Sequence, residues 1–126
     1  MEAGRARRKR RRLSRSGDFE RVYREGRSHA SRYLVVYSFP RADDAGPPRL
    51  GVSVGRKLGG AVQRNRVKRL LREAFWGAAD SLSPGHDFVI VARPEAGPLA
   101  EARGGGGIEE ALRDVLSAAG LKRGDA

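Results

Sequence analysis

The chain has 126 residues, with 26 lysines and arginines, 15 aspartates and glutamates, and no cysteine. This length suits one domain with a single core, and the lack of cysteine excludes disulfides and cysteine-based zinc sites. No stretch approaches the roughly 20 apolar residues of a membrane span, and no apolar run follows the basic N-terminus as in a secretory signal. These features predict a cytoplasmic protein.

The positive charge is concentrated in one part of the chain. Residues 1–72 carry 21 basic and 6 acidic side chains, whereas residues 73–126 carry 5 basic and 9 acidic ones. A basic region of this kind indicates a polyanionic partner, with nucleic acid first and an anionic membrane surface second. A basic surface that is only solvated is the remaining alternative.

The N-terminal region begins with an arm that has no means of building a core. Residues 1–12 contain seven basic side chains and almost nothing apolar, which predicts a disordered arm that binds a polyanion or is merely solvated. Next, Ser16 or Asp18 is placed to cap a short helix that carries Phe19 and Tyr23 on one face and ends at Gly26.

Two strands are predicted after this helix. Residues 33–39 are rich in aromatic and β-branched side chains, and residues 49–54 form a second strand after a loop at 40–48. We expect these two strands to pair antiparallel. A glycine-rich turn at 55–60 follows.

The second half of the chain alternates between helix and strand. A long helix is expected from about residue 62 to 76, and after a turn at 83–87 comes an apolar strand at 88–92, typical of a strand covered on both faces. Residues 102–107, which include four glycines, indicate a flexible linker, and 108–120 form a last helix that ends at Gly120.

The element order is therefore α-β-β-α-β-α, an α/β sandwich with one small sheet. We expect a single domain over residues 13–121, with a short tail at 122–126. The strand at 49–54, the long helix and the strand at 88–92 form a β-α-β unit, whose strands should be parallel neighbours. The general rule makes such a crossover right-handed.

The long helix is amphipathic and strongly basic. Its apolar stripe consists of Val67, Leu70, Leu71, Ala74 and Phe75. The opposite side carries Asn65, Lys68, Arg69 and Arg72, and Arg64 and Arg66 flank the stripe. No carboxylate occurs between Arg56 and Arg72, so the cations repel one another without a local partner. Phosphate groups near the positive N-terminal end of the helix would relieve that repulsion.

A catalytic site belonging to the protein itself is not expected. Glu73 and Asp87 are single carboxylates, and His29 and His86 lack a catalytic partner in the sequence pattern. The turn "GRKLGGAVQRN" matches neither a P-loop nor a dinucleotide-binding fingerprint. These single carboxylates and histidines also predict no metal site on the protein.

Three segments resemble the bacterial ribonuclease P protein subunit. The most specific is "RLGVSVGRKLGGAVQRNRVKRLLREAF" at 49–75, which contains the "RNR" motif. Upstream, "RLSRSGDFERVYREGRS" resembles the N-terminal segment of that family, and "GHDFVIVARPEA" resembles its strand after the helix. The resemblance covers about residues 12–96.

The resemblance implies an α-β sandwich with a left-handed β-α-β crossover, against the general rule, and a central cleft. It implies that the protein binds ribonuclease P RNA and the 5′ leader of precursor tRNA, without a small-molecule substrate. It also implies that the RNA performs the cleavage that matures the tRNA 5′ end, using Mg²⁺ held mainly by that RNA. The competing interpretations are a ribosomal or general RNA-chaperone protein and an autonomous nuclease.

The family's functional positions transfer to specific residues. Those implied to contact the ribozyme RNA are Arg56, Lys57, Arg64, Asn65, Arg66, Lys68, Arg69 and Arg72. Those implied to line the leader cleft are Phe19, Tyr23 and Tyr37, although membership of the core is an equal alternative for the first two. Gly55 and the run Gly104–Gly107 depart from the family pattern.

Overall fold

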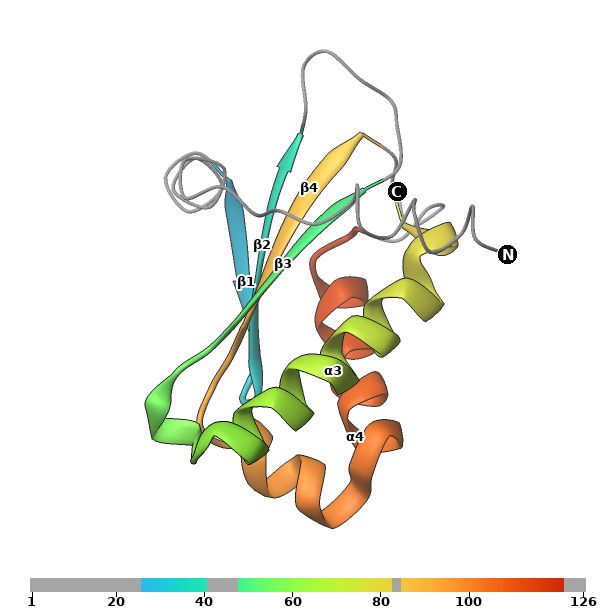
Figure 1. The fold of residues 1–126 in the computed structure, drawn as a ribbon. Helices are drawn as coiled ribbons and strands as arrows, with labels where there is room; N and C mark the ends of the chain where they lie inside the picture. The colour runs from blue at the N-terminus through green and yellow to red at the C-terminus, as the bar shows by residue number, and fades with distance from the viewer. Residues whose placement is uncertain (1–25, 41–47, 83–84, 122–126) are drawn as a thin grey trace, which may run out of the picture.

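The computed structural model describes residues 26–40, 48–82 and 85–121. These residues form a sheet that is covered on one face by two helices (Figure 1). The predicted arm at 1–12, the predicted helix around Phe19 and Tyr23 and the tail at 122–126 lie outside these residues. The elements are β1 (Arg27–Ala30), β2 (Leu34–Pro40), β3 (Arg49–Val54), η1 (Arg56–Leu58), α3 (Ala61–Ala78), η2 (Ala79–Ser81), β4 (His86–Ala92) and α4 (Ala96–Ala118). None of the described helices is long and apolar enough to cross a bilayer.

The sheet has the strand order β1-β2-β4-β3, with β3 parallel to β4 and the other neighbours antiparallel. The prediction that residues 49–54 pair with 33–39 was wrong, because β4 lies between them. Strand β4 takes the central place because Val89 and Ile90, which point to opposite faces, are both fully buried. Strand β1 was not predicted, since its sequence RSHA has none of the usual strand formers and its residues are exposed.

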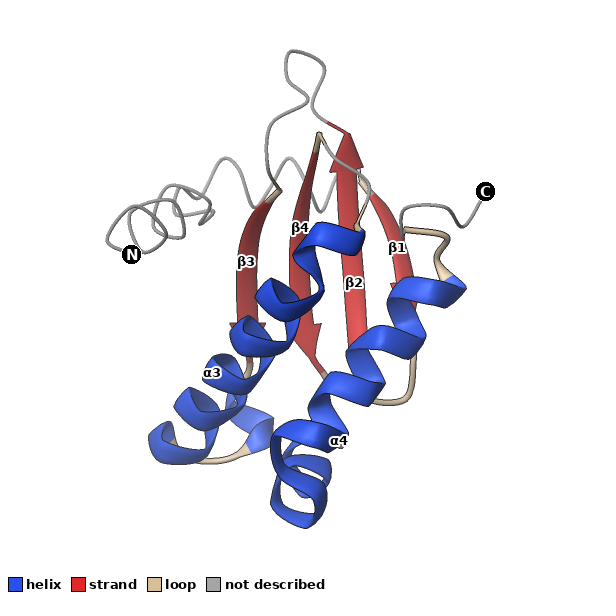
Figure 2. Cartoon of the chain, turned by 90° about the vertical axis from the view of Figure 1, so that its right-hand side faces the viewer, coloured by secondary structure: helices blue, strands red, loops and turns tan. Residues whose placement is uncertain are grey.

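The β3-α3-β4 crossover is left-handed. In Figure 2 both helices lie in front of the sheet, β3 and β4 point downward, and β4 lies to the right of β3. A right-handed crossover viewed in this way would place β4 to the left. The family resemblance therefore predicted the correct hand, and the general rule did not.

The core lies between the sheet and the two helices. The predicted stripe of α3 is confirmed, because Val67, Leu70, Leu71 and Phe75 are buried, with Ala74 partly buried beside them. The Phe75 ring packs against Phe88 of β4, with ring centroids 5.3 Å apart. One face of β2 and the inner side of α4 complete the core with Leu34, Val36, Ile108, Leu112, Val115 and Leu116.

The glycine run in α4 is a kink and not a flexible linker. The helix begins at Ala96, well before residue 108, and only Gly104 leaves helical geometry, with φ 58° and ψ −148°. Side chains rarely adopt that conformation, so glycine is needed there. A Cβ atom on Gly107 would lie 2.6 Å from the Cβ of Arg103, so this glycine allows the two turns to approach closely. The kink at Gly104 thus joins two helical segments, one before it and one after it.

Helix α4 is terminated by Gly120, as predicted. The Leu121 N–H donates to the Leu116 carbonyl and the Gly120 N–H to the Ser117 carbonyl, both at 3.1 Å. Gly120 has a φ of 70°. This is the Schellman arrangement, and Leu121 packs back on the core.

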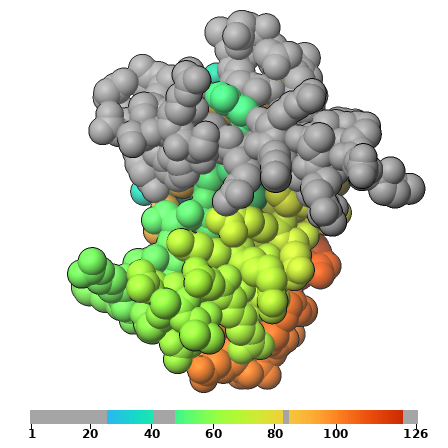
Figure 3. Space-filling view, viewed as in Figure 1, coloured from blue at the N-terminus to red at the C-terminus, as the bar shows by residue number. Residues whose placement is uncertain are grey.

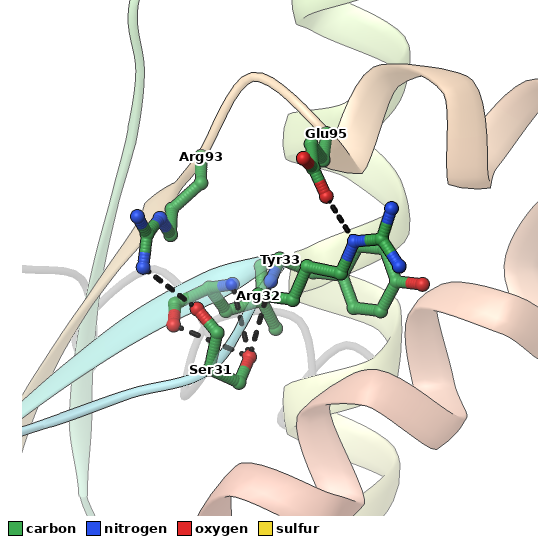
Figure 4. Close-up of polar contacts among 6 residues, drawn as sticks. Ser31, Arg32, Tyr33, Arg93 and Glu95 are labelled. Atoms are coloured by element: carbon green, nitrogen blue, oxygen red, sulfur yellow. Dashed lines mark hydrogen bonds and ion pairs between the residues drawn. The ribbon is translucent and has the colours of Figure 1, made fainter.

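The turn between β1 and β2 is tied to the start of α4 (Figure 4). The Ser31 hydroxyl accepts hydrogen bonds from the N–H groups of Tyr33 and Leu34, each at 3.2 Å. Arg93 donates to the Ser31 carbonyl at 3.0 Å, and Arg32 forms an ion pair with Glu95. The hydrogen bond to Glu95 raises the pKa of Arg32. These contacts anchor the first half of α4 beside the sheet.

Candidate nucleic-acid interface

Helix α3 begins without a capping side chain. Its N-cap is Gly60, and its first turn contains no acidic residue. The Gly60 N–H donates to Oε1 of Gln63 at 2.9 Å, and the Gly60 carbonyl accepts from the Arg64 N–H at 2.9 Å. Because glycine has no side-chain oxygen, no N-cap side chain satisfies the first-turn amides, and the helix dipole favours negative charge at this end.

The residues predicted to bind RNA lie together on η1 and α3, and we call them the basic surface. Its members are Arg56, Lys57, Arg64, Asn65, Arg66, Lys68, Arg69 and Arg72. Arg64, Lys68 and Arg72 are half-buried, and the other five are exposed. Figure 3 shows that η1 and α3, coloured green to yellow-green, present one continuous outer surface. The structure thus brings these positions together, as the helical spacing predicts.

The cations of the basic surface differ from those elsewhere in their ion pairing. Within residues 26–40, 48–82 and 85–121, no ion pair involves Arg56, Lys57, Arg64, Arg66, Lys68 or Arg69. Of the six described arginines outside the basic surface, four form ion pairs with described carboxylates, namely Arg32–Glu95, Arg49–Asp87, Arg103–Glu110 and Arg113–Glu109. No carboxylate of the described residues therefore relieves the repulsion among these six cations.

The two arginines of the RNR motif lie on opposite flanks of α3. Nη2 of Arg66 lies 3.4 Å from the Ala100 carbonyl oxygen of α4, a long hydrogen bond. On the other flank, the Nε atom of Arg64 is buried and has no hydrogen-bond partner among the described residues. Among the buried side-chain nitrogen and oxygen atoms of the described part of the chain, it is the one atom that lacks a partner. Asn65, between them in sequence, is exposed. The motif therefore spans the outer half of the helix.

Two apolar residues of α3, Val62 and Trp76, differ in their exposure to solvent. Val62, in the first turn of α3, is 82% exposed and was not singled out from the sequence. An apolar residue on the polar side of the helical wheel, opposite the stripe through Val67 and Leu71, was the signal that could have marked it. Trp76 is half-buried within α3, and its ring meets Phe75 edge-to-face with centroids 5.0 Å apart. Trp76 therefore packs against the core cluster from within α3.

Tyr37 lies on the other face of the sheet. In β2, Leu34, Val36 and Ser38 face the helices, and the alternate residues Tyr37 and Phe39 pack with Val89 and Val91 on the opposite face. Tyr37 is half-buried there. Phe19 and Tyr23, the other residues predicted for the leader cleft, lie outside the described residues. The basic surface and Tyr37 are thus separated by the thickness of the sheet.

The single carboxylates noted in the sequence, Asp87 and Glu73, have different surroundings. The carboxylate of Asp87 is fully buried and accepts two hydrogen bonds from Arg49, at 2.9 Å and 2.6 Å. His86 lies beside Phe88, and Glu73 is exposed. No three His, Cys, Asp or Glu side chains in the described parts of the chain come together as a metal site would require. Asp87 therefore has a structural role as the partner of Arg49.

Comparison with known proteins assigns the family. The model of the Ribonuclease P family matches residues 8–116. The Ribonuclease P protein component of Bacillus cereus (strain B4264) is 34% identical over 115 residues, which are 91% of this chain and 96% of the relative. The chain belongs to the ribonuclease P protein family. The Ribonuclease P protein component of Carboxydothermus hydrogenoformans is 44% identical over 81 residues, which are 64% of this chain and 70% of the relative.

Solved ribonuclease P proteins share this fold. A mutant RNase P protein from Staphylococcus aureus superposes with a TM-score of 0.83 at 32% identity, covering 96% of this chain and 98% of the other. The RNase P protein from Thermotoga maritima gives a TM-score of 0.74 at 32% identity, covering 83% and 94%. The α/β sandwich predicted from the sequence is thereby confirmed.

Proposed function

We propose that this protein binds the catalytic RNA of ribonuclease P through the basic surface and supports maturation of the tRNA 5′ end. The observation that carries the proposal is the contrast in ion pairing. In the described part of the chain, four of the six arginines outside the basic surface pair with carboxylates, whereas six cations of one helix and its preceding turn have no acidic partner there. Phosphodiesters spaced along a folded RNA are suited to neutralise such a row.

The open N-terminus of α3 adds to this surface. Its uncapped amides donate hydrogen bonds, and its dipole favours negative charge. Exposed Asn65 supplies an amide that can donate and accept hydrogen bonds beside these cations. Such groups fix the register of a protein on RNA, while the guanidinium and ammonium groups contribute most of the affinity.

The opposite face of the sheet is proposed to bind the 5′ leader of precursor tRNA. Tyr37, half-buried among Phe39, Val89 and Val91, offers part of an aromatic ring on that face. Unpaired bases stack on such rings with about 1–3 kcal/mol each. Phe19 and Tyr23 are proposed to complete the site. In this arrangement the sheet separates the ribozyme-binding surface from the leader-binding surface.

The chemistry of cleavage is assigned to the RNA partner. The carboxylate of Asp87 is engaged by Arg49 in the protein interior. We assign Mg²⁺ mainly to the RNA and place the complex in the cytoplasm. The protein's contribution is then to neutralise phosphate repulsion and to hold the substrate.

Reconstitution tests the proposal. Precursor tRNA is incubated with a ribonuclease P RNA at low Mg²⁺, with and without the protein. Specific 5′ cleavage should require the RNA and should increase strongly when the protein is added. Specific cleavage by the protein alone would establish an autonomous nuclease. A failure to assist the RNA would favour a general RNA chaperone or ribosomal protein.

A further inference from the structure

A second basic site lies away from the basic surface, at the other end of the sheet. A cavity of about 530 Å³ opens between the C-terminal end of α4 and the strands β1, β2 and β4. Its polar lining includes Arg27 and His29 from β1, Ser38 from β2 and His86 from β4. Figure 2 shows the last turns of α4 in front of β1 and β2. The volume falls in the range of small-ligand sites.

The strand register brings these polar groups together. Arg27 is directly opposite Ser38, and His86 is opposite Pro40, two residues further along the same face of β2. His29 follows Arg27 by two residues and so shares its face. Directly opposed residues in antiparallel strands have Cβ atoms about 5 Å apart, and diagonal neighbours about 7–8 Å. One guanidinium, two imidazoles and a hydroxyl therefore converge on one hollow.

The charges in this cavity favour an anion. None of the described residues that line it is acidic. The nearby carboxylate of Asp87 belongs to the other face of β4 and is engaged by Arg49. Val36 and Leu121 provide apolar walls, which strengthen electrostatic attraction inside the hollow.

The end of α4 opposes this preference only weakly. A helix C-terminus is negative, but the carbonyls of Leu116 and Ser117 already accept hydrogen bonds from Leu121 and Gly120. The lining residues from this end of α4 are Ala118, Ala119, Gly120 and Leu121, which bear no charged side chain. β2 likewise contributes no titratable group. Arg27, His29 and His86 are thus the ionisable side chains of the described lining.

We propose that this cavity binds a phosphate group, held by Arg27, His29, Ser38 and His86. The donors match a phosphate, which accepts charge-assisted hydrogen bonds from guanidinium and imidazolium. The phosphate belongs either to a mononucleotide or to the backbone of a bound RNA. The site is separate from the basic surface, so it is testable on the free protein.

The sequence offers a direct reporter for this test. The whole chain has two histidines, and both line the cavity. Their ring proton signals are followed by NMR in the full chain while inorganic phosphate replaces chloride at constant ionic strength. Both rings should shift together and saturate.

Variants separate this site from general attraction to a basic protein. Arg27→Gln should weaken phosphate binding at least tenfold, whereas Arg113→Gln, which removes an exposed charge outside the cavity lining, should leave it within twofold. Ser38→Ala should weaken binding less than Arg27→Gln. Shifts that never saturate, or equal affinity in wild type and Arg27→Gln, would overturn the proposal. So would saturating shifts with Zn²⁺ and none with phosphate.

The source of the phosphate is resolved by two further probes. Adenosine 5′-monophosphate carries a terminal phosphate, and a short 5′-hydroxyl RNA carries only bridging ones. A nucleotide site should saturate with the first probe and ignore the second. A backbone site should saturate with the RNA, and Arg27→Gln should lower its log–log salt slope by about 0.7. Binding of neither probe would contradict the proposal.

Discussion

The salt dependence of RNA binding follows from the unpaired cations of the basic surface. Six of them have no ion pair among the described residues. If each contacts one phosphate, the slope of log K against log salt is about −4 to −5. Each lost contact then removes about 0.7–0.9 from the slope and costs about sixfold in affinity at 0.1 M salt, or about 1 kcal/mol.

The variant for this experiment is Arg56→Ala/Lys57→Ala/Arg69→Ala. These three side chains are exposed and unpaired among the described residues, so their removal should leave the fold intact. Affinity at 0.1 M salt should fall about two hundredfold and the slope should flatten by about 2–3. Arg64 and Arg66 are less suitable, because one has a buried Nε and the other contacts Ala100.

A matched control removes a cation that is already paired. Arg113, exposed on α4, forms an ion pair with Glu109. Arg113→Ala should leave both the slope and the affinity nearly unchanged. Binding of a ribonuclease P RNA is measured by filter retention or fluorescence anisotropy across a salt series. A triple variant with the wild-type slope would refute the assignment of these side chains to the interface.

Three other predictions concern the stability of the fold and the proposed binding of the 5′ leader. Arg49→Met should lower the free energy of unfolding in urea by about 2–4 kcal/mol, because it removes the arginine that pairs with the buried Asp87 carboxylate. Breaking a fully buried pair costs about 3–5 kcal/mol, and the cost is smaller here since Arg49 is 27% exposed. Adding Asp87→Asn should recover part of this loss, and purely additive effects would disprove the coupling. Gly104→Ala should cost about 1–3 kcal/mol, whereas Gly106→Ala, with open space around it, should not destabilise. Phe19→Ala should weaken binding of precursor tRNA with a 5′ leader more than binding of mature tRNA, and equal losses would remove Phe19 from the leader site.

Local features of the fold were readable from side-chain spacing. The stripe through Val67, Leu70, Leu71 and Phe75 predicted which side of α3 is buried, since helical spacing directly determines the face. The apolar run at 88–92 predicted a strand covered on both sides, as β4 is. The cationic residues were placed for the same reason, because they occupy the remaining sides of the helix.

Features that depend on distant parts of the chain were not readable in this way. Spacing gives a strand's face but not its neighbour, so the insertion of β4 between β2 and β3 escaped prediction. The composition of the glycine run suggests a linker, yet burial of Ala100 before it and Ile108 after it holds both sides in helical form. The contact of Arg66 with the Ala100 carbonyl depends on that same packing of α4 beside α3.

Site-specific crosslinking tests the central claim most directly. The chain has no cysteine, so Val62→Cys, at the exposed start of α3, gives a unique attachment point for a photoreactive group. Asp114→Cys, exposed on α4, is the matched control. In the reconstituted complex, the group at residue 62 should crosslink efficiently to ribonuclease P RNA and that at residue 114 should not. Crosslinks of equal yield from both positions, or from residue 114 alone, would contradict the placement of the RNA on the basic surface.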